Sequence, residues 1–231
     1  MNKTIYKIGM VSLLALILFT LPLWNVQEIM ITGNAQYTHE EIKEAIGYTK
    51  GRHILSYNKN KMKEAIKELS YIERVAINYT FPNNINIDIV ERRPVGYLPF
   101  LDTLLCIDEE GTVLKQVQTK QEQLPIIEGI GFESFAVGEK VQTTNQVQLN
   151  ALKEIIFYLT KYEFVDKVEA VQLTNLEQIH LYVNKLDVII GSMRDFDKKV
   201  KWLVEIHTDF PMGILDLSLI KYDQAVLKPL N

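Results

Sequence analysis

Cysteine and histidine are the residue types in this chain that most directly offer nucleophilic or metal chemistry. The sequence contains one cysteine, Cys106, and four histidines. A cysteine nucleophile needs a thiolate, a histidine that activates it and a cation that stabilises the developing oxyanion. His53 upstream and Arg194 downstream are the nominal candidates for these two roles. A single cysteine also excludes an intramolecular disulfide and a cysteine-based metal site.

The surroundings of Cys106 argue against a catalytic thiol. The run Thr103–Cys106 faintly resembles the nucleophile strand of sortase-like cysteine transpeptidases, but Leu105 stands where those enzymes have threonine. His53 falls in a different predicted structural unit, away from any sheet that holds Cys106. Because a free cysteine packs like a small hydrophobic residue, we predict that Cys106 is a buried strand residue and that the chain is not an enzyme.

The histidines and glycines predict neither a cofactor site nor a metal site. His39, His53, His180 and His207 lack metal-ligand spacing, and we expect His180 and His207 to be buried or half-buried with hydrogen bonds. The sequence has no phosphate-binding glycine loop, and Gly129–Gly131 is interpreted as a loop. The formal net charge of −4 gives no reason to expect nucleic acid. We therefore predict no cofactor, metal, nucleic-acid partner or small-molecule substrate, which leaves recognition of other proteins.

The N-terminal segment has the composition of a membrane anchor. Ile8 to Trp24 is almost wholly apolar, and no charged residue lies between Lys7 and Glu28. About 20 helical residues at ~1.5 Å rise cross the ~30 Å hydrocarbon core of a bilayer. Trp24 stands at the outer boundary, where interfacial aromatic residues are common. The residues predicted to contact lipid include Ile8, Leu14, Leu18 and Trp24.

A cleaved signal peptide is the alternative for this segment. It would have a shorter apolar core and small residues at a cleavage site, whereas Leu21–Val26 is mostly bulky, so an uncleaved helix is favoured. Lys3 and Lys7 precede the apolar run, which places the N-terminus in the cytoplasm by the positive-inside rule. We therefore predict a cytoplasmic tail at residues 1–7, a transmembrane helix at residues 8–25 and an extracellular remainder, the topology of a single-pass type II protein of the cell membrane.

Residues 26–93 show the order β-α-α-β-β. Gly33–Asn34 has turn chemistry and ends the first strand. Thr38 and Glu41 form a capping box, in which the hydroxyl caps a free backbone N–H and the carboxylate reaches back to the cap residue. Gly47 ends the helix that follows. The predicted elements are a strand at 26–32, helices at about 38–47 and 58–69, and a hairpin at about 75–90.

Residues 94–222 are predicted to form a second domain of mixed α+β class, followed by a short tail at 223–231. Its strongest element is a helix at 145–162, where Leu152, Ile155, Ile156 and Leu159 recur at helical spacing. The residues at 108–111 are interpreted as a polar hairpin turn. The other predicted elements are strands at about 105–107, 112–115, 167–173, 177–183, 186–191 and 214–220, and a helix at 195–207.

The unit at 26–93 resembles a POTRA domain, and the wider sequence is similar to the FtsQ/DivIB family of bacterial cell-division proteins. The resemblance is specific over about residues 8–97. Tyr71 departs from it, because family members often have proline at this point. For the following region, the family's "β domain", the match rests on position and element order. The resemblance is carried by Gly33, Asn34, Tyr37, Thr38, Glu41, Gly47, Glu91, Arg92, Arg93, Pro94 and Val95.

The resemblance implies a non-enzymatic divisome scaffold that is enriched at the division septum. Members of the family bind two small bitopic coiled-coil partners, of the FtsB/DivIC and FtsL types, and so help couple septal peptidoglycan synthesis to cell division. In that family, a partner adds a strand to an edge of the β domain near its C-terminus.

The last predicted strand, Leu215–Tyr222, is the best local candidate for such an edge. An edge strand offers unpaired backbone N–H and C=O groups that a partner strand can complete. Leu215, Leu217 and Leu219 are expected to face the core. The predicted partner-binding residues are therefore the outward-facing Asp216, Ser218, Ile220 and Tyr222.

Two alternatives stay open from the sequence. The basic helix around Lys59 to Lys67 could face anionic lipid or wall polymer, although a solvated helix face is the simpler interpretation. The other functional hypothesis is a POTRA-bearing chaperone for export or for assembly of a membrane β-barrel. A single POTRA unit, an N-terminal anchor and the lack of repeated barrel strands downstream argue against it.

Overall fold

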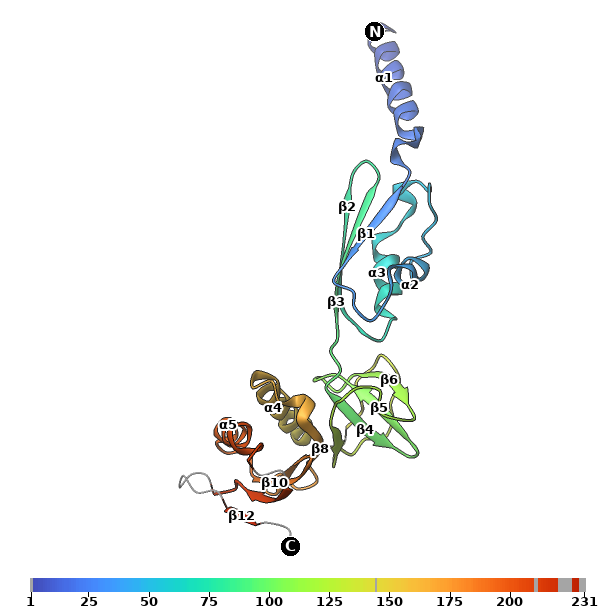
Figure 1. Ribbon diagram of the computed structural model, residues 1–231. Helices are drawn as coiled ribbons and strands as arrows, with labels where there is room; N and C mark the ends of the chain where they lie inside the picture. Colours follow the sequence, from blue (N-terminus) through green and yellow to red (C-terminus); the bar gives the residue numbers. More distant parts are fainter. Residues whose placement is uncertain (1, 144, 210–211, 220–225, 229–231) are drawn as a thin grey trace. The chain divides into compact units, whose positions relative to one another are not determined.

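The computed structural model describes residues 2–143, 145–209, 212–219 and 226–228 and divides the chain into two compact units (Figure 1). Unit 1 comprises Met1–Arg92, and unit 2 comprises Arg93–Asn231. Each unit has its own cluster of buried apolar side chains. Both units combine helices with a sheet, which confirms the predicted α+β class.

Unit 1 builds a three-stranded sheet in the order β1-β3-β2, with β1 parallel to β3 and β2 antiparallel to it. The β-α-α-β-β order predicted for the POTRA domain is confirmed. Ile42 of one helix and Ile66 of the other are completely buried in the core that these helices share with the sheet. The elements are α1 (Asn2–Thr20), a 3-10 turn (Pro22–Trp24), β1 (Glu28–Thr32), α2 (His39–Ala45), a second 3-10 turn (Ile54–Ser56), α3 (Lys59–Lys67), β2 (Ile72–Thr80) and β3 (Asn84–Glu91).

The first helix differs in its limits from the predicted transmembrane helix at 8–25. It begins at Asn2, inside the predicted cytoplasmic tail, and ends at Thr20. Pro22 explains the early end, because a proline disfavours the helical conformation of the residue before it. Leu21 accordingly has an extended backbone, with φ −66° and ψ 146°.

Unit 2 builds a nine-stranded sheet in the order β12-β11-β10-β9-β8-β7-β4-β5-β6. Two helices pack against the buried side chains of the strands near the C-terminus. The hairpins β4–β5 and β5–β6 form the other end of the sheet. The elements are β4 (Gly96–Phe100), β5 (Thr103–Ile107), β6 (Val113–Val117), β7 (Ile126–Glu128), α4 (Gln146–Lys161), a 3-10 turn (Val165–Lys167), β8 (Val168–Gln172), β9 (Ile179–Val183), β10 (Lys185–Gly191), α5 (Phe196–Ile206), β11 (Met212–Asp216) and β12 (Val226–Lys228).

Most of the predicted elements of unit 2 are present. The four apolar residues of the predicted helix stripe on α4 are all buried, and the turn at 108–111 joins β5 to β6. Three strands were not predicted. They are β4, which follows directly after the Arg92–Val95 motif, β7, and β12, which lies in the segment expected to be a tail. The sheet therefore extends beyond residue 222.

Candidate partner-binding surface

The C-terminal end of the nine-stranded sheet contains the residues predicted to bind a partner. Here β11 lies between β10, which is parallel to it, and β12, which is antiparallel. Its backbone is therefore paired on both sides at Ile214–Asp216. The expectation that Leu215–Tyr222 forms the final strand is wrong, because β11 ends at Asp216 and β12 follows. Within the described ranges, β12 is the edge of the sheet.

A turn in which a side chain accepts a backbone hydrogen bond ends β11. The Asp216 carboxylate accepts hydrogen bonds from the Ser218 backbone N–H at 2.9 Å and from the Ser218 hydroxyl at 2.6 Å. A side-chain acceptor of this kind offers the backbone an alternative to the sheet ladder. Leu217 is still buried and donates its N–H to the Ile189 carbonyl at 2.8 Å. Leu219, expected in the core, is instead 56% exposed, because the strand alternation stops before it.

Asp216 and Ser218 thus lie at the end of β11, and their role in binding stays a prediction. Ile220 and Tyr222 fall outside the described residues. The Ser218 N–H is already engaged by Asp216, so the groups that a partner strand could reach most directly are those of the β12 backbone.

Gly191 lets the end of β10 approach this turn. Its φ is +69°, and a Cβ at this position would lie 2.9 Å from the Ser218 Cβ. The register of the β9–β10 pair also shifts between Ile189 and Gly191. Glycine is the residue that accepts both the left-handed backbone and the close contact. Gly191 was not among the predicted site residues. The signal in the sequence that points to it is a glycine at the end of an apolar strand.

Lys199 joins α5 to the same end of β10. Its side chain is buried, and Nζ donates to the carbonyl oxygens of Ile190 and Ser192, both at 2.8 Å. Burial lowers the pKa of the Lys199 ammonium, since it penalises the charged form. Residue type alone places a lysine in solvent, although position 199 falls on the apolar stripe of α5 between Phe196 and Leu203. Sequence reasoning therefore missed this contact.

The sheet face that carries His180 holds a polar and aromatic group. His180 Nδ1 lies 2.7 Å from the Asp187 carboxylate on the neighbouring strand, and the His180 ring stacks on Tyr182 at 6.2 Å between centroids. Burial raises the pKa of the Tyr182 hydroxyl. His207 Nδ1 lies 2.8 Å from the Val204 carbonyl oxygen. Both histidines are partly buried and hydrogen-bonded, as predicted.

Two of the residues considered for catalysis, Cys106 and His53, lie in different units. Cys106 is completely buried in β5, which confirms its prediction as a strand residue. His53 accepts the Leu55 N–H through Nδ1 at 3.3 Å, and its Nε2 lies 3.2 Å from the Phe19 carbonyl oxygen. In the part of the chain that the structure describes, no three histidine, cysteine or acidic side chains are grouped so that they could hold a metal ion.

Motif residues of unit 1 hold the loop between β1 and α2 by hydrogen bonds. The Glu91 carboxylate accepts the backbone N–H groups of Ala35 at 3.0 Å, Gln36 at 2.7 Å and Tyr37 at 3.2 Å. Within the loop, the Asn34 amide donates to the Tyr37 carbonyl at 2.7 Å. Glu91 therefore connects the last strand of the POTRA fold to its first loop.

The remaining motif residues have backbone roles. Gly33 has a φ of +82°, and a Cβ there would overlap the Ile89 carbonyl oxygen. The capping box of Thr38 and Glu41 is confirmed, with both reciprocal bonds present. Gly47 has a φ of +64° after α2. The segment Arg92–Val95 connects the two units, and its ends donate backbone N–H groups to the carbonyls of Tyr71 and Ile107.

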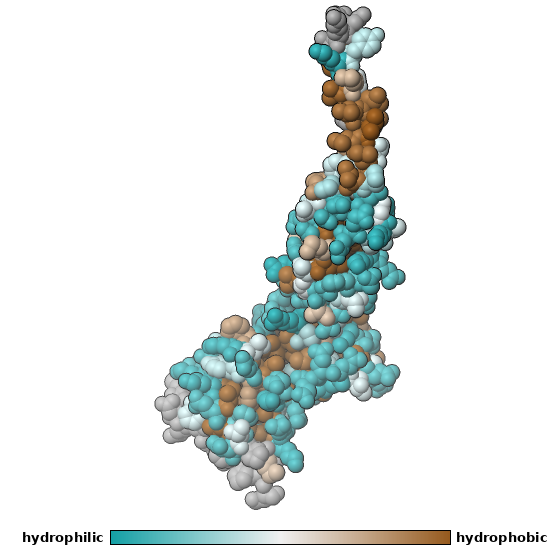
Figure 2. Space-filling model, turned by 45° about the horizontal axis from the view of Figure 1, so that its top comes forward, coloured by the Kyte–Doolittle hydropathy of each residue, from teal (hydrophilic) through white to brown (hydrophobic). Residues whose placement is uncertain are grey.

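The predicted anchor residues lie on α1 and just after it. Ile8, Leu14 and Leu18 are each more than half exposed, and apolar side chains surround this helix (Figure 2). Trp24 is half-buried against the POTRA core and donates its indole N–H to the Leu18 carbonyl at 2.9 Å. None of the helices within the described residues meets both the length and the apolar character required to cross a membrane.

Both units match models of known protein families. A model of the FtsQ-type POTRA domain matches residues 24–92, and a model of the C-terminal region of the cell division protein FtsQ/DivIB matches residues 102–220. The cell division protein DivIB of Clostridium tetani is 27% identical over 196 residues, which cover 84% of this chain and 74% of the relative. DivIB of Bacillus subtilis is 23% identical over 218 residues, which cover 92% and 78%.

A solved structure of the major extracytoplasmic domain of DivIB from Geobacillus stearothermophilus is also similar to the chain. It has 16% sequence identity and a TM-score of 0.34, and the match covers 52% of this chain and 95% of that one.

An FtsQ-type POTRA unit followed by a strand-rich C-terminal unit defines a class of cell division protein. The order of the two family matches along the chain is the order of the two structural units. The chain belongs to the FtsQ/DivIB family of cell division proteins, which implies a role in the divisome.

Proposed function

We propose that this chain is a bitopic, non-enzymatic scaffold of the divisome that binds coiled-coil partners of the FtsB/DivIC and FtsL types. The contact lies at the edge formed by β12 and the end of β11, near Asp216 and Ser218. Ile220 and Tyr222, which fall outside the described residues, are proposed to take part in it as well. Through it, the chain helps couple septal peptidoglycan synthesis to cell division.

The observation that carries this proposal is a short edge strand, β12, at the C-terminal end of the sheet of unit 2; the FtsQ/DivIB C-terminal match, at residues 102–220, lies in the same unit and ends before this strand. β12 pairs with β11 on one side, at Val226–Lys228, and no strand of the described ranges pairs with its other side. Free backbone donors and acceptors along an edge are what a partner strand recognises. The turn at Asp216 and the contact at Gly191 hold β11 in place behind that edge.

We further propose that α1 anchors the chain in the cell membrane, with the N-terminus in the cytoplasm and the two units outside, at the septum. The apolar run from Ile8 to Trp24 and the exposure of its side chains on α1 support an anchor. Lys3 and Lys7 on one side of the run support the orientation.

A proline scan of β12 tests the binding edge. Val226→Pro, Leu227→Pro and Lys228→Pro each remove one backbone N–H, and successive N–H groups of an antiparallel edge strand point alternately inward and outward. We expect proline at an outward position to reduce co-purification of both coiled-coil partners from solubilised membranes at least tenfold, the loss that follows from ~1.4 kcal/mol. Proline at an inward position should also loosen β12 from β11.

Thermal unfolding of unit 2 identifies the variants that remain folded. Tyr222→Ala serves as the side-chain counterpart and is expected to weaken co-purification without affecting unfolding. The proposal is wrong if all three proline variants remain folded and retain both partners at the level of the unmodified chain.

A further inference from the structure

We propose that the end of unit 1 next to α1 is a binding surface for anionic phospholipid headgroups, on which the POTRA domain rests against the bilayer. This inference rests on the proposed anchoring by α1. The surface, called here the lipid-facing end, comprises two exposed apolar side chains, Leu55 and Phe81, and three cations, Arg52, Lys59 and Lys61.

The short connection between α1 and the POTRA core brings this end close to the bilayer. α1 ends at Thr20, and Val26 is already a completely buried core residue. Even a fully extended chain covers at most ~3.6 Å per residue, and the 3-10 turn at Pro22–Trp24 shortens the connection further. If α1 spans the hydrocarbon, the near end of unit 1 therefore lies at the level of the headgroups.

A chain of aromatic contacts shows which part of unit 1 forms that near end. The ring of Phe19 in α1 lies 5.4 Å from the His53 ring and 5.6 Å from the Trp24 ring, measured between centroids. Trp24 in turn lies 6.0 Å from Phe81 in the β2–β3 turn, and Phe81 lies 6.4 Å from Tyr79. Rings with one apolar and one polar end are favoured at membrane interfaces. The β2–β3 turn and the segment around His53 therefore both adjoin α1.

Backbone bonds hold the segment around residue 52 in the same place. The Val26 N–H donates to the Arg52 carbonyl at 2.9 Å, and the Gly51 N–H donates to the Val26 carbonyl at 2.9 Å. Leu55 and Phe81 are 52% and 57% exposed. Two large apolar side chains that project from the end of a domain next to an apolar helix fit insertion into the boundary between headgroups and acyl chains.

Positive charges predominate at this end. Residues 49–63 contain five lysines and arginines and no acidic residue, although the chain as a whole has a net charge of −4. In the described part of the chain, none of these five forms an ion pair, whereas Lys67 at the far end of α3 pairs with Glu64 at 4.0 Å. The hairpin segment 75–87 carries no charge. Glu28, in register with Asn84 beside the hairpin turn, and Glu64 on α3 are carboxylates of the same region. Because the cations outnumber them, an anionic bilayer surface is attracted to the lipid-facing end.

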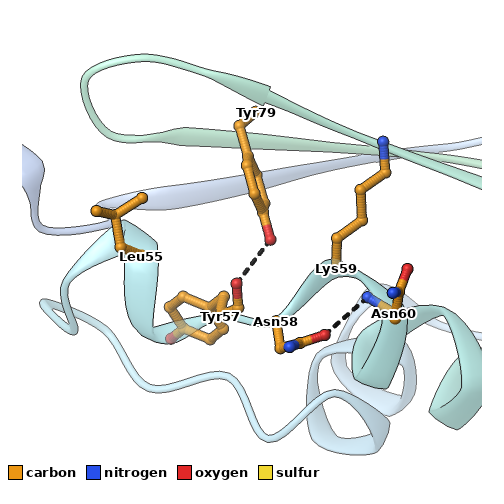
Figure 3. A pocket seen from close by; sticks show the side chains of 6 residues that line it. All are labelled: Leu55, Tyr57, Asn58, Lys59, Asn60 and Tyr79. Carbon is orange, nitrogen blue, oxygen red and sulfur yellow. Dashed lines mark hydrogen bonds between the residues drawn. The ribbon is translucent and has the colours of Figure 1, made fainter.

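An open hollow at this end is lined by one cation, Lys59, which can meet a phosphate (Figure 3). Its volume is about 370 Å³, and Leu55, Lys59 and Tyr79 stand around it. The Tyr79 hydroxyl donates to the Tyr57 carbonyl at 2.7 Å. The guanidinium carbon of Arg52 lies 5.3 Å from the centroid of the Tyr57 ring, which holds that cation beside the hollow.

The apolar side chains distinguish a lipid from a soluble polyanion. An anionic wall polymer would engage the cations but gain nothing from Leu55 and Phe81, which are costly to expose. A phospholipid uses both, because its phosphate meets Lys59 while its glycerol and acyl carbons meet Leu55. These residues lie next to α1, so the bilayer that holds α1 is the favoured ligand of the lipid-facing end.

Hydrogen exchange of the full chain in nanodiscs tests the inference. We compare discs of phosphatidylcholine alone with discs that contain increasing phosphatidylglycerol. Peptides over 50–60 and 79–83 should become protected as phosphatidylglycerol increases, and high salt should weaken the protection. Lys59→Gln should raise the phosphatidylglycerol fraction needed for half-maximal protection roughly fivefold, the factor for one cation at an anionic surface. Lys67→Gln, which removes a paired lysine from the same helix, should change nothing.

A second variant pair tests the apolar part. Leu55→Ser with Phe81→Ser should reduce protection in both kinds of disc, while peptides over the POTRA core keep their exchange rates. The inference is overturned if the two segments exchange equally in both discs and in detergent, or if protection requires a coiled-coil partner and ignores the lipid. Co-flotation of the chain with the lipid reports anchoring separately, so a chain that floats but shows no protection refutes this inference and leaves the anchor standing.

Discussion

The two units stabilise their sheets in different ways. In unit 1, single side chains hold loops: Glu91 accepts three backbone N–H groups from the loop after β1, and Thr38 and Glu41 cap α2. Unit 2 also has side chains that bind single backbone groups, such as Asp216 and Lys199, but most of its large sheet is stabilised by apolar faces packed against α4 and α5. A side chain that accepts a specific backbone group must be a particular residue, whereas a core position accepts several apolar residues of similar volume. Unit 1 is therefore recognisable from a motif of particular residues, whereas unit 2 is recognisable only from its pattern of apolar and polar positions.

Replacing Glu91 should give the largest effect, because it removes the acceptor for the whole loop. Glu91→Ala leaves the N–H groups of Ala35, Gln36 and Tyr37 without their partner. Hydrogen bonds to a charged group contribute about 1.5–3 kcal/mol each, and solvent can replace part of this loss. We expect unit 1 to lose about 3 kcal/mol of unfolding free energy, with little change in unit 2.

Tryptophan fluorescence separates the two units in this experiment. The chain has two tryptophans, Trp24 in unit 1 and Trp202 in unit 2, so replacing one by phenylalanine leaves a reporter for the other unit during urea unfolding. Glu91→Gln keeps one acceptor oxygen and should lose less than Glu91→Ala. An equal loss of stability in both units would contradict the view that the motif acts locally.

The same difference explains how much of the fold the sequence predicts. Capping boxes and helix stripes involve residues three or four positions apart, so Thr38 with Glu41 and the stripe of α4 were both predicted correctly. Strand pairing in unit 2 joins distant segments, such as β4 with β7 and β11 with β12. Three-residue strands carry too few residues to show alternation, and this is why β7 and β12 were missed.

Gly191 offers a test of unit 2 that should give the next largest effect. In Gly191→Ala, the new methyl meets the Ser218 Cβ at 2.9 Å and the backbone has a φ of +69°. Left-handed backbone costs a residue with a side chain roughly 1–2 kcal/mol, and the contact adds to this. We expect a loss of about 2–3 kcal/mol in unit 2, read from Trp202, together with weaker retention of the coiled-coil partners.

Gly51→Ala is the matched control for this substitution. Gly51 also has a positive φ, +80°, but a Cβ there would meet nothing within 4 Å. Gly51→Ala should therefore lower the unfolding free energy only by the cost of the left-handed backbone, about 1–2 kcal/mol. It should leave partner retention unchanged. If the two alanines cost the same, the approach of β10 to the turn at Ser218 is not what Gly191 is required for.

The candidate binding surface was less predictable than the fold. Asp216 and Ser218 lie at the end of β11, where their mutual hydrogen bonds end the strand that was expected to continue. Lys199 is buried and donates to the carbonyl oxygens of Ile190 and Ser192, which its residue type does not reveal. Such contacts depend on where three elements meet, and a single sequence does not contain that information locally.

Replacing Glu110 should give the smallest effect on stability. The residue is a useful comparison with Glu91, because it is a carboxylate of unit 2 that binds side chains instead of backbone groups. It lies 2.7 Å from the Lys140 ammonium and 2.9 Å from that of Lys153. Hydrogen bonds to Lys140, then to Lys153, lower the pKa of Glu110 from 4.5 to about 2. The stabilisation is therefore complete above pH 4.5 and is lost as the pH falls toward 2.

The Glu110 side chain is 43% exposed, so solvent screens both ion pairs and we expect no more than about 1 kcal/mol from them. In Glu110→Gln, the unfolding free energy of unit 2 should fall less steeply between pH 4.5 and 2 than in the unmodified chain, and high salt should narrow the difference. Glu109→Gln removes a neighbouring charge and neither ion pair, so its pH profile should follow that of the unmodified chain. If Glu110→Gln lowered the unfolding free energy at neutral pH as much as Glu91→Ala does, exposed ion pairs would stabilise unit 2 as strongly as the motif stabilises unit 1. The contrast between the two units would then be wrong.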